Sequence, residues 1–305
     1  MDFLRFLAEY RTPAGEKIFQ FFTYFGQELF IILILCLIYW CLNKKLAYQI
    51  GLTFFVSGLF VQILKIVFRV PRPWVIDPQF SPVASAVSAA TGYSFPSGHT
   101  QTSTALFGTL ALYLKKPWQR IVCVFLFVMV GFSRMYLGVH TPKDVFVSMI
   151  LTLLIAFVIS RIRVPLEKHS VSAAFVSCIL GICSLFTAGV ALLFLNQELI
   201  PSDYAADACK AAGAGLGFAL AWYLEHTCVN FENKVPLNKQ IQKLFLGLTV
   251  TAVLEFGLKW FAGDGLLLGG LRYFLIVLWA IALFPFLDKK FSWGFFGFPK
   301  SGNRP

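Results

Sequence analysis

Apolar segments alternate with short polar stretches along almost the whole of this 305-residue sequence. The hydrocarbon core of a bilayer requires about 20 apolar residues of helix, so segments of roughly this length predict transmembrane helices. The pattern therefore predicts an all-α integral membrane protein, a polytopic helical bundle with about nine transmembrane helices. The predicted spans are residues 18–42, 46–68, 99–114, 118–137, 145–160, 171–195, 208–224, 241–261 and 266–287.

Composition leads to the same class of protein. Hydrophobic residues make up 58% of the chain and charged residues only 13%, which is too few for the hydrated surface of a soluble domain. The formal net charge is +11, but the basic residues are scattered among apolar segments, so the predicted partners are membrane lipids and not nucleic acid. The seven cysteines show no C-x-x-C spacing and predict neither a disulfide framework nor a metal site.

Three polar clusters border apolar segments, where charged side chains are costly and usually functional. They are Lys65 to Arg72-Pro73, F-P-S-G-H-T at residues 95–100, and Ser133-Arg134 followed by His140 and Asp144. In the second cluster Ser97 is a good N-cap and Gly98 lets a ligand approach the backbone, so the free N–H groups at this helix start favour an anion. An ordinary helix start has the same sequence pattern, so the hexapeptide alone is weak evidence for an anion site. The other two clusters strengthen this interpretation.

These residue types suit phosphate chemistry. A phosphoester carries several anionic oxygens and hydrolyses very slowly without a catalyst, so catalysis needs charge neutralisation and alignment. Lys65, Arg72 and Arg134 provide the charge; one of them alone could instead reach a lipid headgroup, but three on one face favour an anion site. Of two histidines, a neutral one can attack phosphorus while a protonated one gives a proton to the leaving oxygen. Three nearby cations would repel a metal ion, so we predict no metal and no cofactor.

The three clusters, written K-x6-R-P, P-S-G-H and S-R-x5-H-x3-D, resemble the signature of the type 2 phosphatidic acid phosphatase superfamily, with every fixed position present between residues 65 and 144. The resemblance implies a phosphatase-type helical core in the first half of the chain and a phosphohistidine mechanism. It implies that His140 is the nucleophile, Asp144 its orienting carboxylate and His99 the acid. The expected phosphate-binding residues are Lys65, Arg72, Ser97, Gly98 and Arg134.

Asp144 also has a structural interpretation. Thr141-Pro142-Lys143-Asp144 is a helix start at which the Asp144 carboxylate can close a capping box. The two roles are compatible if one carboxylate oxygen accepts from the backbone while the other oxygen faces the imidazole.

Loop charges predict the orientation of the chain. An odd number of spans puts the termini on opposite sides, and the loops on one side carry Lys44, Lys45, Lys115, Lys116, Arg120, Arg161 and Arg163. The positive-inside rule makes this side cytoplasmic, which places all three polar clusters on the extracytoplasmic side. The sequence has no N-x-S/T site, which favours a bacterial plasma membrane.

The chain divides into a membrane-embedded catalytic core, predicted at residues 1–163, and an additional transmembrane helical region, predicted at residues 164–305. The second region contains Gly213-x-x-x-Gly217, a small-residue motif at which helices approach closely. Packing within the chain is the favoured interpretation of this motif, and a homodimer is left open.

The leading hypothesis is a membrane phosphatase that removes phosphate from a lipid or polyprenyl substrate on the extracytoplasmic face. One alternative is a sugar phosphatase of the glucose-6-phosphatase type, which the nine spans and Arg72-Pro73-Trp74 resemble. Another is a transporter that binds phosphate without hydrolysis, although a transporter has no need of the second histidine or the orienting carboxylate. Phosphate release from lipid and sugar phosphates would separate the three.

Overall fold

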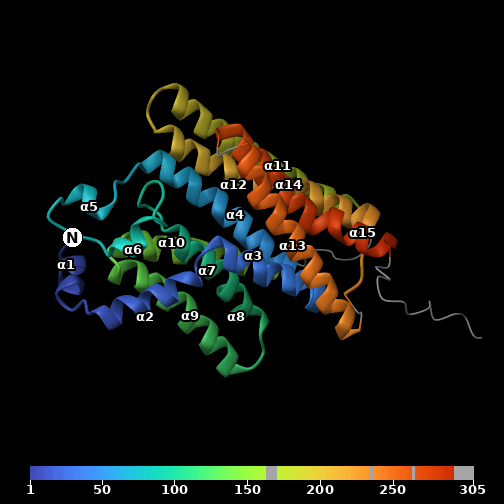
Figure 1. Cartoon of the computed structure of the whole chain (residues 1–305), viewed down its shortest axis with the longest axis horizontal. Coiled ribbons are helices and arrows are strands. Elements are labelled where there is room, and N and C mark those ends of the chain that lie inside the picture. Colours follow the sequence, from blue (N-terminus) through green and yellow to red (C-terminus); the bar gives the residue numbers. More distant parts are fainter. Residues whose placement is uncertain (163–169, 234–235, 263–264, 292–305) are drawn as a thin grey trace, which may run out of the picture.

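Helices connected by short loops make up the described part of the chain, which in this computed structural model comprises residues 1–162, 170–233, 236–262 and 265–291 (Figure 1). No strand occurs in these residues, so the predicted all-α class is confirmed.

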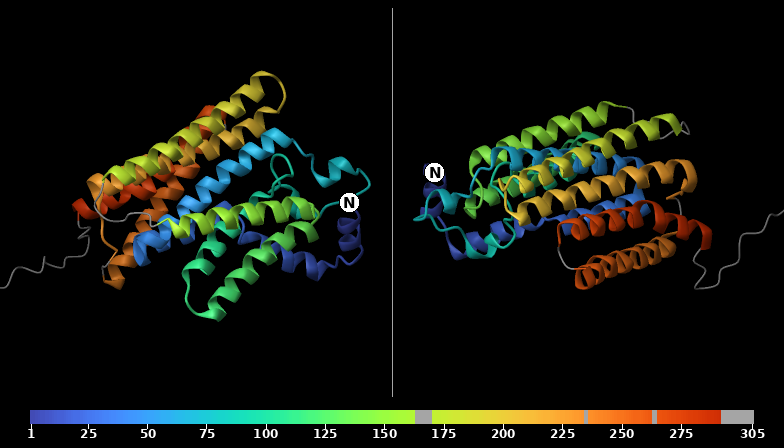
Figure 2. Two further views of the ribbon diagram at one scale, coloured as in Figure 1. Left: turned by 180° about the vertical axis from the view of Figure 1, so that it is seen from behind. Right: turned by 90° about the horizontal axis from the view of Figure 1, so that it is seen from above.

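The helix α4 packs against α10 in the first part of the chain and against α11 and α12 in the second part, and so joins the two (Figures 1 and 2). The elements up to residue 162 are α1 (Asp2–Glu9), α2 (Pro13–Tyr24), α3 (Glu28–Leu37), η1 (Ile38–Leu42), α4 (Lys44–Phe68), α5 (Pro73–Ile76), α6 (Ala84–Val87), α7 (Gly98–Ser103), η2 (Thr104–Gly108), α8 (Thr109–Tyr113), α9 (Pro117–Tyr136) and α10 (Pro142–Arg161), where η marks a π-helical turn. The elements that follow are α11 (Ser170–Asn196), α12 (Ser202–Leu224), η3 (Glu225–Val229), α13 (Leu237–Ala262), α14 (Leu266–Leu278), η4 (Trp279–Leu283) and α15 (Phe284–Phe291). The predicted boundary between residues 163 and 164 lies outside the described residues and stays a prediction.

Six segments of the described chain are long and apolar enough to cross a membrane, or seven if the bent pair of α2 and α3 is one span. The six are Lys44–Ile76, Pro117–Tyr136, Pro142–Arg161, Ala173–Asn196, Leu237–Trp260 and Leu266–Lys290. The predicted count of nine is not confirmed. The predicted span 99–114 is short and interrupted by η2, and α12 carries Asp203, Asp207 and Lys210 in its first turns, which lowers its hydropathy.

The outward faces of the long helices are covered by large apolar side chains. Phe125, Phe146, Ile150, Leu154, Phe175, Ile182, Phe186, Phe245 and Phe256 are each more than half exposed. A continuous apolar surface of this kind is stable in lipid and prone to aggregation in water. The chain is therefore an integral membrane protein, as the composition predicted.

The predicted span 18–42 is not one continuous helix. α2 and α3 meet at an angle of 46°. A Cβ at Gly26, within the break, would lie 2.7 Å from the backbone oxygen of His99 and 2.8 Å from Val130 Cγ1. Only glycine allows such a close approach, so the break brings the chain against the start of α7.

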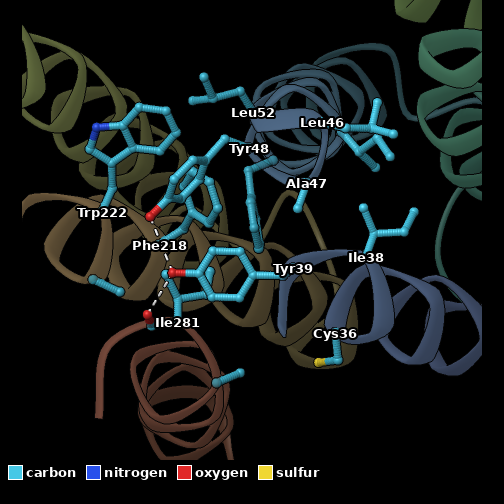
Figure 3. Close-up of a cluster of buried hydrophobic side chains, with 14 of the residues drawn as sticks. Cys36, Ile38, Tyr39, Leu46, Ala47, Tyr48, Leu52, Phe218, Trp222 and Ile281 are labelled. Atoms are coloured by element: carbon cyan, nitrogen blue, oxygen red, sulfur yellow. Dashed lines mark hydrogen bonds between the residues drawn. The ribbon is translucent and has the colours of Figure 1, made fainter. Parts of the chain in front are cut away.

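The largest buried cluster lies where α3, η1 and α4 meet α12 and η4 (Figure 3). Tyr39 OH donates to the carbonyl oxygen of Ile281 at 2.8 Å and lies 3.1 Å from Tyr48 OH. The ring of Tyr48 packs on Trp222, with 4.1 Å between the ring centroids. Both parts of the chain therefore contribute to one core, and the buried hydroxyl groups have the partners that burial requires.

The small-residue face of α12 packs against α14. A Cβ at Gly213 would lie 2.0 Å from the carbonyl oxygen of Gly270, and one at Gly217 would lie 2.5 Å from that of Phe274. The two backbones are in direct contact at these glycines, as in other small-xxx-small helix pairs. The prediction that this motif packs within the chain is confirmed.

Candidate active site

The end of α9 and the start of α10 hold His140 and Asp144 in one turn. The carbonyl oxygen of Arg134 accepts a hydrogen bond from the N–H of His140 at 3.3 Å. α10 begins at Pro142, which suits the first helical position because an N–H there would lack a partner within the helix. Asp144 Oδ2 accepts from the N–H of Thr141 at 2.8 Å, so Asp144 closes the predicted capping box.

The Asp144 carboxylate also faces the ring of His140. Its Oδ2 lies 3.5 Å from His140 Nδ1 and accepts a 2.6 Å hydrogen bond from Ser94 Oγ. Asp144 thus combines the cap with the contact to the imidazole, and one oxygen, Oδ2, makes both contacts where the sequence suggested one oxygen for each. His140 is 2% exposed and Asp144 is 1% exposed, so water screens this interaction very little.

Arg72 lies on the other side of the imidazole. Arg72 Nη1 is 2.9 Å from His140 Nε2, and because a guanidinium can only donate, Nε2 is the acceptor. The ring proton is then on Nδ1, toward Asp144. Burial lowers the pKa of His140, and the charge of Arg72 lowers it further. The imidazole is therefore neutral at neutral pH, with its lone pair on Nε2.

Arg72 also fixes the loop that precedes the P-S-G-H turn. Nε donates to the carbonyl oxygen of Gly92 at 2.9 Å and Nη2 donates to that of Thr91 at 2.5 Å. Nη1 donates to the carbonyl oxygen of Val139 at 3.1 Å. Arg72 is only 5% exposed, and these bonds offset much of the cost of removing its charge from water. The guanidinium therefore has a defined position beside His140.

The P-S-G-H turn is attached to the first turns of α10. The N–H of Ser97 donates to the carbonyl oxygen of Asp144 at 3.1 Å, and Ser148 Oγ donates to the carbonyl oxygen of Ser97 at 2.7 Å. The Ser97 hydroxyl accepts from the N–H of Thr100 at 3.4 Å, which makes Ser97 the N-cap of α7, as predicted. These bonds explain how residues near 97 and near 140, distant in sequence, come together.

A cavity of about 430 Å³ opens beside this turn, within the range of small-molecule sites. We call it the polar cavity. Five of the eight predicted site residues line it: Lys65, Arg72, Gly98, His99 and His140. A Cβ at Gly98 would lie 4.0 Å from Lys65 Nζ, so the missing side chain keeps the space beside the lysine open. Ser97, Arg134 and Asp144 are buried behind the wall and do not line the cavity.

Two buried side chains near this cavity have nitrogen atoms without a hydrogen-bond partner among the described residues. Arg134 is fully buried, and while its Nη1 donates to Thr23 Oγ1 at 2.8 Å, its Nε and Nη2 have no partner. The Nε2 atom of His99 is buried and also without a partner. Unpaired buried groups are rare and costly, and they suit a site whose anionic ligand supplies the missing oxygen atoms.

Several residues of the site lie outside the three sequence clusters. The polar cavity is also lined by Gln27 from the break between α2 and α3, by Glu28 at the start of α3, and by Asp207, Lys210 and Tyr273 from α12 and α14. Charge bordering a predicted apolar span is a signal that could have pointed to Asp207 and Lys210. Ser94 gives no such signal, because its partner His140 is 46 positions away.

Comparison with known proteins connects this site to a family. Residues 46–165 match the profile of the PAP2 superfamily, and residues 209–294 match that of the PAP2 superfamily phosphatase transmembrane extension. Together these two segments cover more than half of the chain. The chain belongs to the PAP2 superfamily. This is the superfamily that the three polar clusters resemble.

Relatives of this PAP2 chain are lipid phosphatases by name. It is 26% identical over 258 residues to sphingosine-1-phosphate phosphatase 2 of Homo sapiens, a match that covers 77% of this chain and 61% of the relative. It is 29% identical over 129 residues to undecaprenyl-diphosphatase of Sulfolobus acidocaldarius, covering 41% of this chain and 60% of the relative. The PAP2 chain thus spans less than two thirds of the length of both.

Among solved structures, the PAP2 chain resembles a transmembrane PAP2 type phosphatidylglycerolphosphate phosphatase from Bacillus subtilis. The TM-score is 0.44 at 23% sequence identity, and the match covers 52% of this chain and 81% of that chain.

Proposed function

We propose that this chain is a membrane phosphatase that hydrolyses a phosphate monoester or diphosphate of an amphiphilic lipid through a phosphohistidine. One observation carries the proposal: the neutral His140 imidazole lies between Arg72 and Asp144 at the edge of a cavity that Lys65 and His99 also line. A nucleophile with its orienting carboxylate, an acid and several cations are the parts that phosphoryl transfer requires.

In the first step the lone pair of His140 Nε2 attacks phosphorus, the P–N bond forms and the bond from phosphorus to the leaving oxygen breaks. His99 takes up a proton as the anionic substrate enters beside it, and gives that proton to the leaving oxygen. In the structure, Arg72 donates an N–H to His140 Nε2. This N–H must turn to a phosphoryl oxygen as the substrate enters, which frees the Nε2 lone pair for the attack. Asp144 stabilises the positive charge that develops on the ring through the Nδ1 proton.

In the second step water attacks phosphorus and transfers a proton to His99, which is now neutral. The P–N bond breaks, inorganic phosphate leaves, and both histidines return to their starting states. Lys65 and Arg72 neutralise the phosphoryl oxygens in both steps, and Arg134 adds positive charge from behind the cavity wall. The N–H groups that follow Ser97 at the start of α7 complete the anion site.

An amphiphile is supported over a sugar phosphate by two observations. The chain is embedded in the membrane, and the named relatives act on sphingosine-1-phosphate and undecaprenyl diphosphate. The sugar phosphatase has in its favour the resemblance of the nine predicted spans and Arg72-Pro73-Trp74, which the named lipid phosphatases outweigh.

We also propose nine membrane crossings with the site on the extracytoplasmic face. Three further crossings are added to the six long segments: the bent pair of α2 and α3, the continuous segment from α7 to α8, and α12. The support is packing: α12 lies against α11 and α14, and α7 lies against α9 and α10. Orientation follows from the basic loops, and a bacterial plasma membrane stays a prediction.

The test is phosphate release by purified protein from a sphingoid phosphate, a polyprenyl diphosphate and a sugar phosphate in detergent micelles. We expect release from at least one of the lipids and a loss of at least 1,000-fold in the His140→Ala variant, because the covalent route then lacks its nucleophile. Unchanged folding of the variant is checked by its elution and melting behaviour. Release by His140→Ala close to the unmodified rate, or no release from any substrate by the unmodified protein, would overturn the proposal.

A further inference from the structure

A second cavity, of about 380 Å³, lies next to the polar cavity, between α3, α4, α13, α14 and η4. We call it the apolar cavity. Six residues line both cavities, so the two lie side by side and share a wall: Glu28, Ile32, Phe54, Phe55, Tyr273 and Val277. A ligand with its headgroup in one cavity reaches the other by displacing only the side chains of this wall.

The two cavities differ in chemistry. Lys65, His99 and His140 are found only in the wall of the first. The wall of the second is dominated by aliphatic and aromatic side chains. Its two carboxylates have partners within the protein, because Glu28 accepts a 3.4 Å hydrogen bond from Tyr273 OH and Glu255 Oε2 lies 3.5 Å from Arg272 Nε. Tyr39 OH and Tyr48 OH lie 3.1 Å apart, and Thr251 Oγ1 donates to the carbonyl oxygen of Gly247 at 2.7 Å. A charged headgroup fits the first cavity and a hydrocarbon chain fits the second.

The apolar cavity follows the length of α3. Leu29 and Tyr39 both line it, and ten residues of helix correspond to about 15 Å. Its outer rim includes Ala252 and Phe256 of α13, which are also exposed on the surface that faces lipid. The cavity is thus open sideways to the bilayer, and a chain can enter without leaving the apolar phase.

We propose that the apolar cavity holds the hydrocarbon chain of the substrate, and that the residues of α13, α14 and η4 determine which chain lengths are accepted. The inference rests on the proposed function, because the chain in the apolar cavity belongs to the substrate whose phosphate occupies the polar cavity. The position of the apolar cavity directly beside the polar cavity favours the substrate chain over a bilayer lipid or a helix of another protein, since only the substrate has to place an anion beside His140.

The physical basis of selectivity is steric. A chain that moves from the bilayer into an apolar cavity gains little from the hydrophobic effect, since lipid is already apolar. Affinity then depends on close contact along the chain, and a chain longer than the cavity must bend or displace side chains. Filling the cavity near its rim should therefore exclude long chains and leave short substrates unaffected.

Ala252→Phe is the test variant and Val253→Phe is its matched control. Both residues are exposed on α13, but only Ala252 lines the apolar cavity. The measurement is kcat/KM for monoalkyl phosphates of increasing length at a fixed mole fraction in mixed micelles, with p-nitrophenyl phosphate as a substrate without a chain. We expect Ala252→Phe to lose about tenfold on the longest chains, a change typical of overpacking, and to match the unmodified protein on p-nitrophenyl phosphate. Val253→Phe should retain the full chain-length profile, and an unchanged profile in Ala252→Phe would overturn the inference.

A labelling experiment tests binding of the chain without relying on substrate turnover. An alkyl phosphonate with a diazirine at the chain end is bound to the unmodified protein, irradiated, and the labelled residues are identified by mass spectrometry. We expect labels on α3, α13 or η4 that excess unlabelled phosphonate suppresses. Labels confined to the outer faces of α9 and α10, or labels on the cavity that the competitor does not suppress, would overturn it. Labelled cavity residues in a protein that hydrolyses no phosphoester would instead overturn the proposed function and leave chain binding standing.

Discussion

The imidazole of His140 lies between a guanidinium and a carboxylate, and each neighbour suits a different requirement of the proposed reaction. Arg72 donates to Nε2, so the ring lone pair is on Nε2, and Asp144 faces Nδ1, which carries the ring proton. Ser94 holds the carboxylate by a 2.6 Å hydrogen bond, so the orientation of the ring depends on a residue outside the three sequence motifs. Removing one member of such a buried network leaves its partners unsatisfied.

His99 should matter in proportion to how much the leaving oxygen needs a proton. We expect His99→Ala to lower kcat by about 100-fold or more for an alkyl phosphate and by less than about tenfold for an aryl phosphate, whose leaving group is a weak base. Phosphate release from both substrates measures this, with His140→Ala as the control that loses both activities. An equal loss on the two substrates would show that His99 is not the acid.

Activity should persist in a chelator. The charge on the phosphate is neutralised in our proposal by Lys65, Arg72 and Arg134, and no group of three or more His, Cys, Asp or Glu in the described residues could hold a metal ion. The measurement is phosphate release before and after incubation with EDTA. Loss of activity that a divalent cation restores would contradict this expectation.

At the scale of the elements, interruptions of helices position the site. The break between α2 and α3 brings Gly26 against His99 and places Gln27 and Glu28 in the cavity wall. The start of α10 holds the P-S-G-H turn through the N–H of Ser97. Hydropathy does not reveal such breaks, because both halves of a broken helix remain apolar.

The contact of α12 with α14 should be sensitive to a single methyl group. In Gly213→Ala the new Cβ would lie 2.0 Å from the carbonyl oxygen of Gly270, so the two backbones must separate. We expect a loss of about 1–3 kcal/mol in the free energy of unfolding. The matched control is Gly181→Ala in α11, where a Cβ meets nothing within 4 Å. Thermal denaturation in detergent compares the two, and equal midpoints would contradict the close packing.

At the scale of the whole molecule, polar groups gather at the two ends of the bundle. One end holds the candidate active site. At the other end Asn43 Nδ2 donates to Tyr113 OH at 2.8 Å, and Lys44 forms an ion pair with the fully buried Glu225. The apolar helices between the two ends match the thickness that a bilayer requires. The fold thus separates the site from the basic loops, and the loops suggest which end faces the cytoplasm.

Sidedness can be measured with a membrane-impermeant thiol reagent on intact cells. We expect labelling of Ser85→Cys, in the short helix α6 before the P-S-G-H turn, and no labelling of Lys116→Cys, in the loop between α8 and α9, because the positive-inside rule places basic loops in the cytoplasm. Both positions are exposed. The exposed native cysteines, Cys178 and Cys228, are first replaced by serine to remove background. The reverse labelling pattern would invert the topology and leave the proposed chemistry unchanged.

The sequence by itself determined the helical class, the membrane environment, the N-cap at Ser97 and the capping box at Asp144. Each of these depends on polarity or on contacts within a few residues, which local sequence records. The three clusters also identified the superfamily, because their residue types and spacings reflect the chemistry of phosphate.

Only the tertiary structure decided how the clusters meet. Helix packing places Ser94 against the Asp144 carboxylate, and it places Glu28 and Asp207 in the wall of the same cavity as Lys65. It also forms the apolar cavity that adjoins this one. These residues come from helices far apart in the chain, and no local pattern encodes which faces will touch. The close approach of α12 to α14, and the break at Gly26, set those faces.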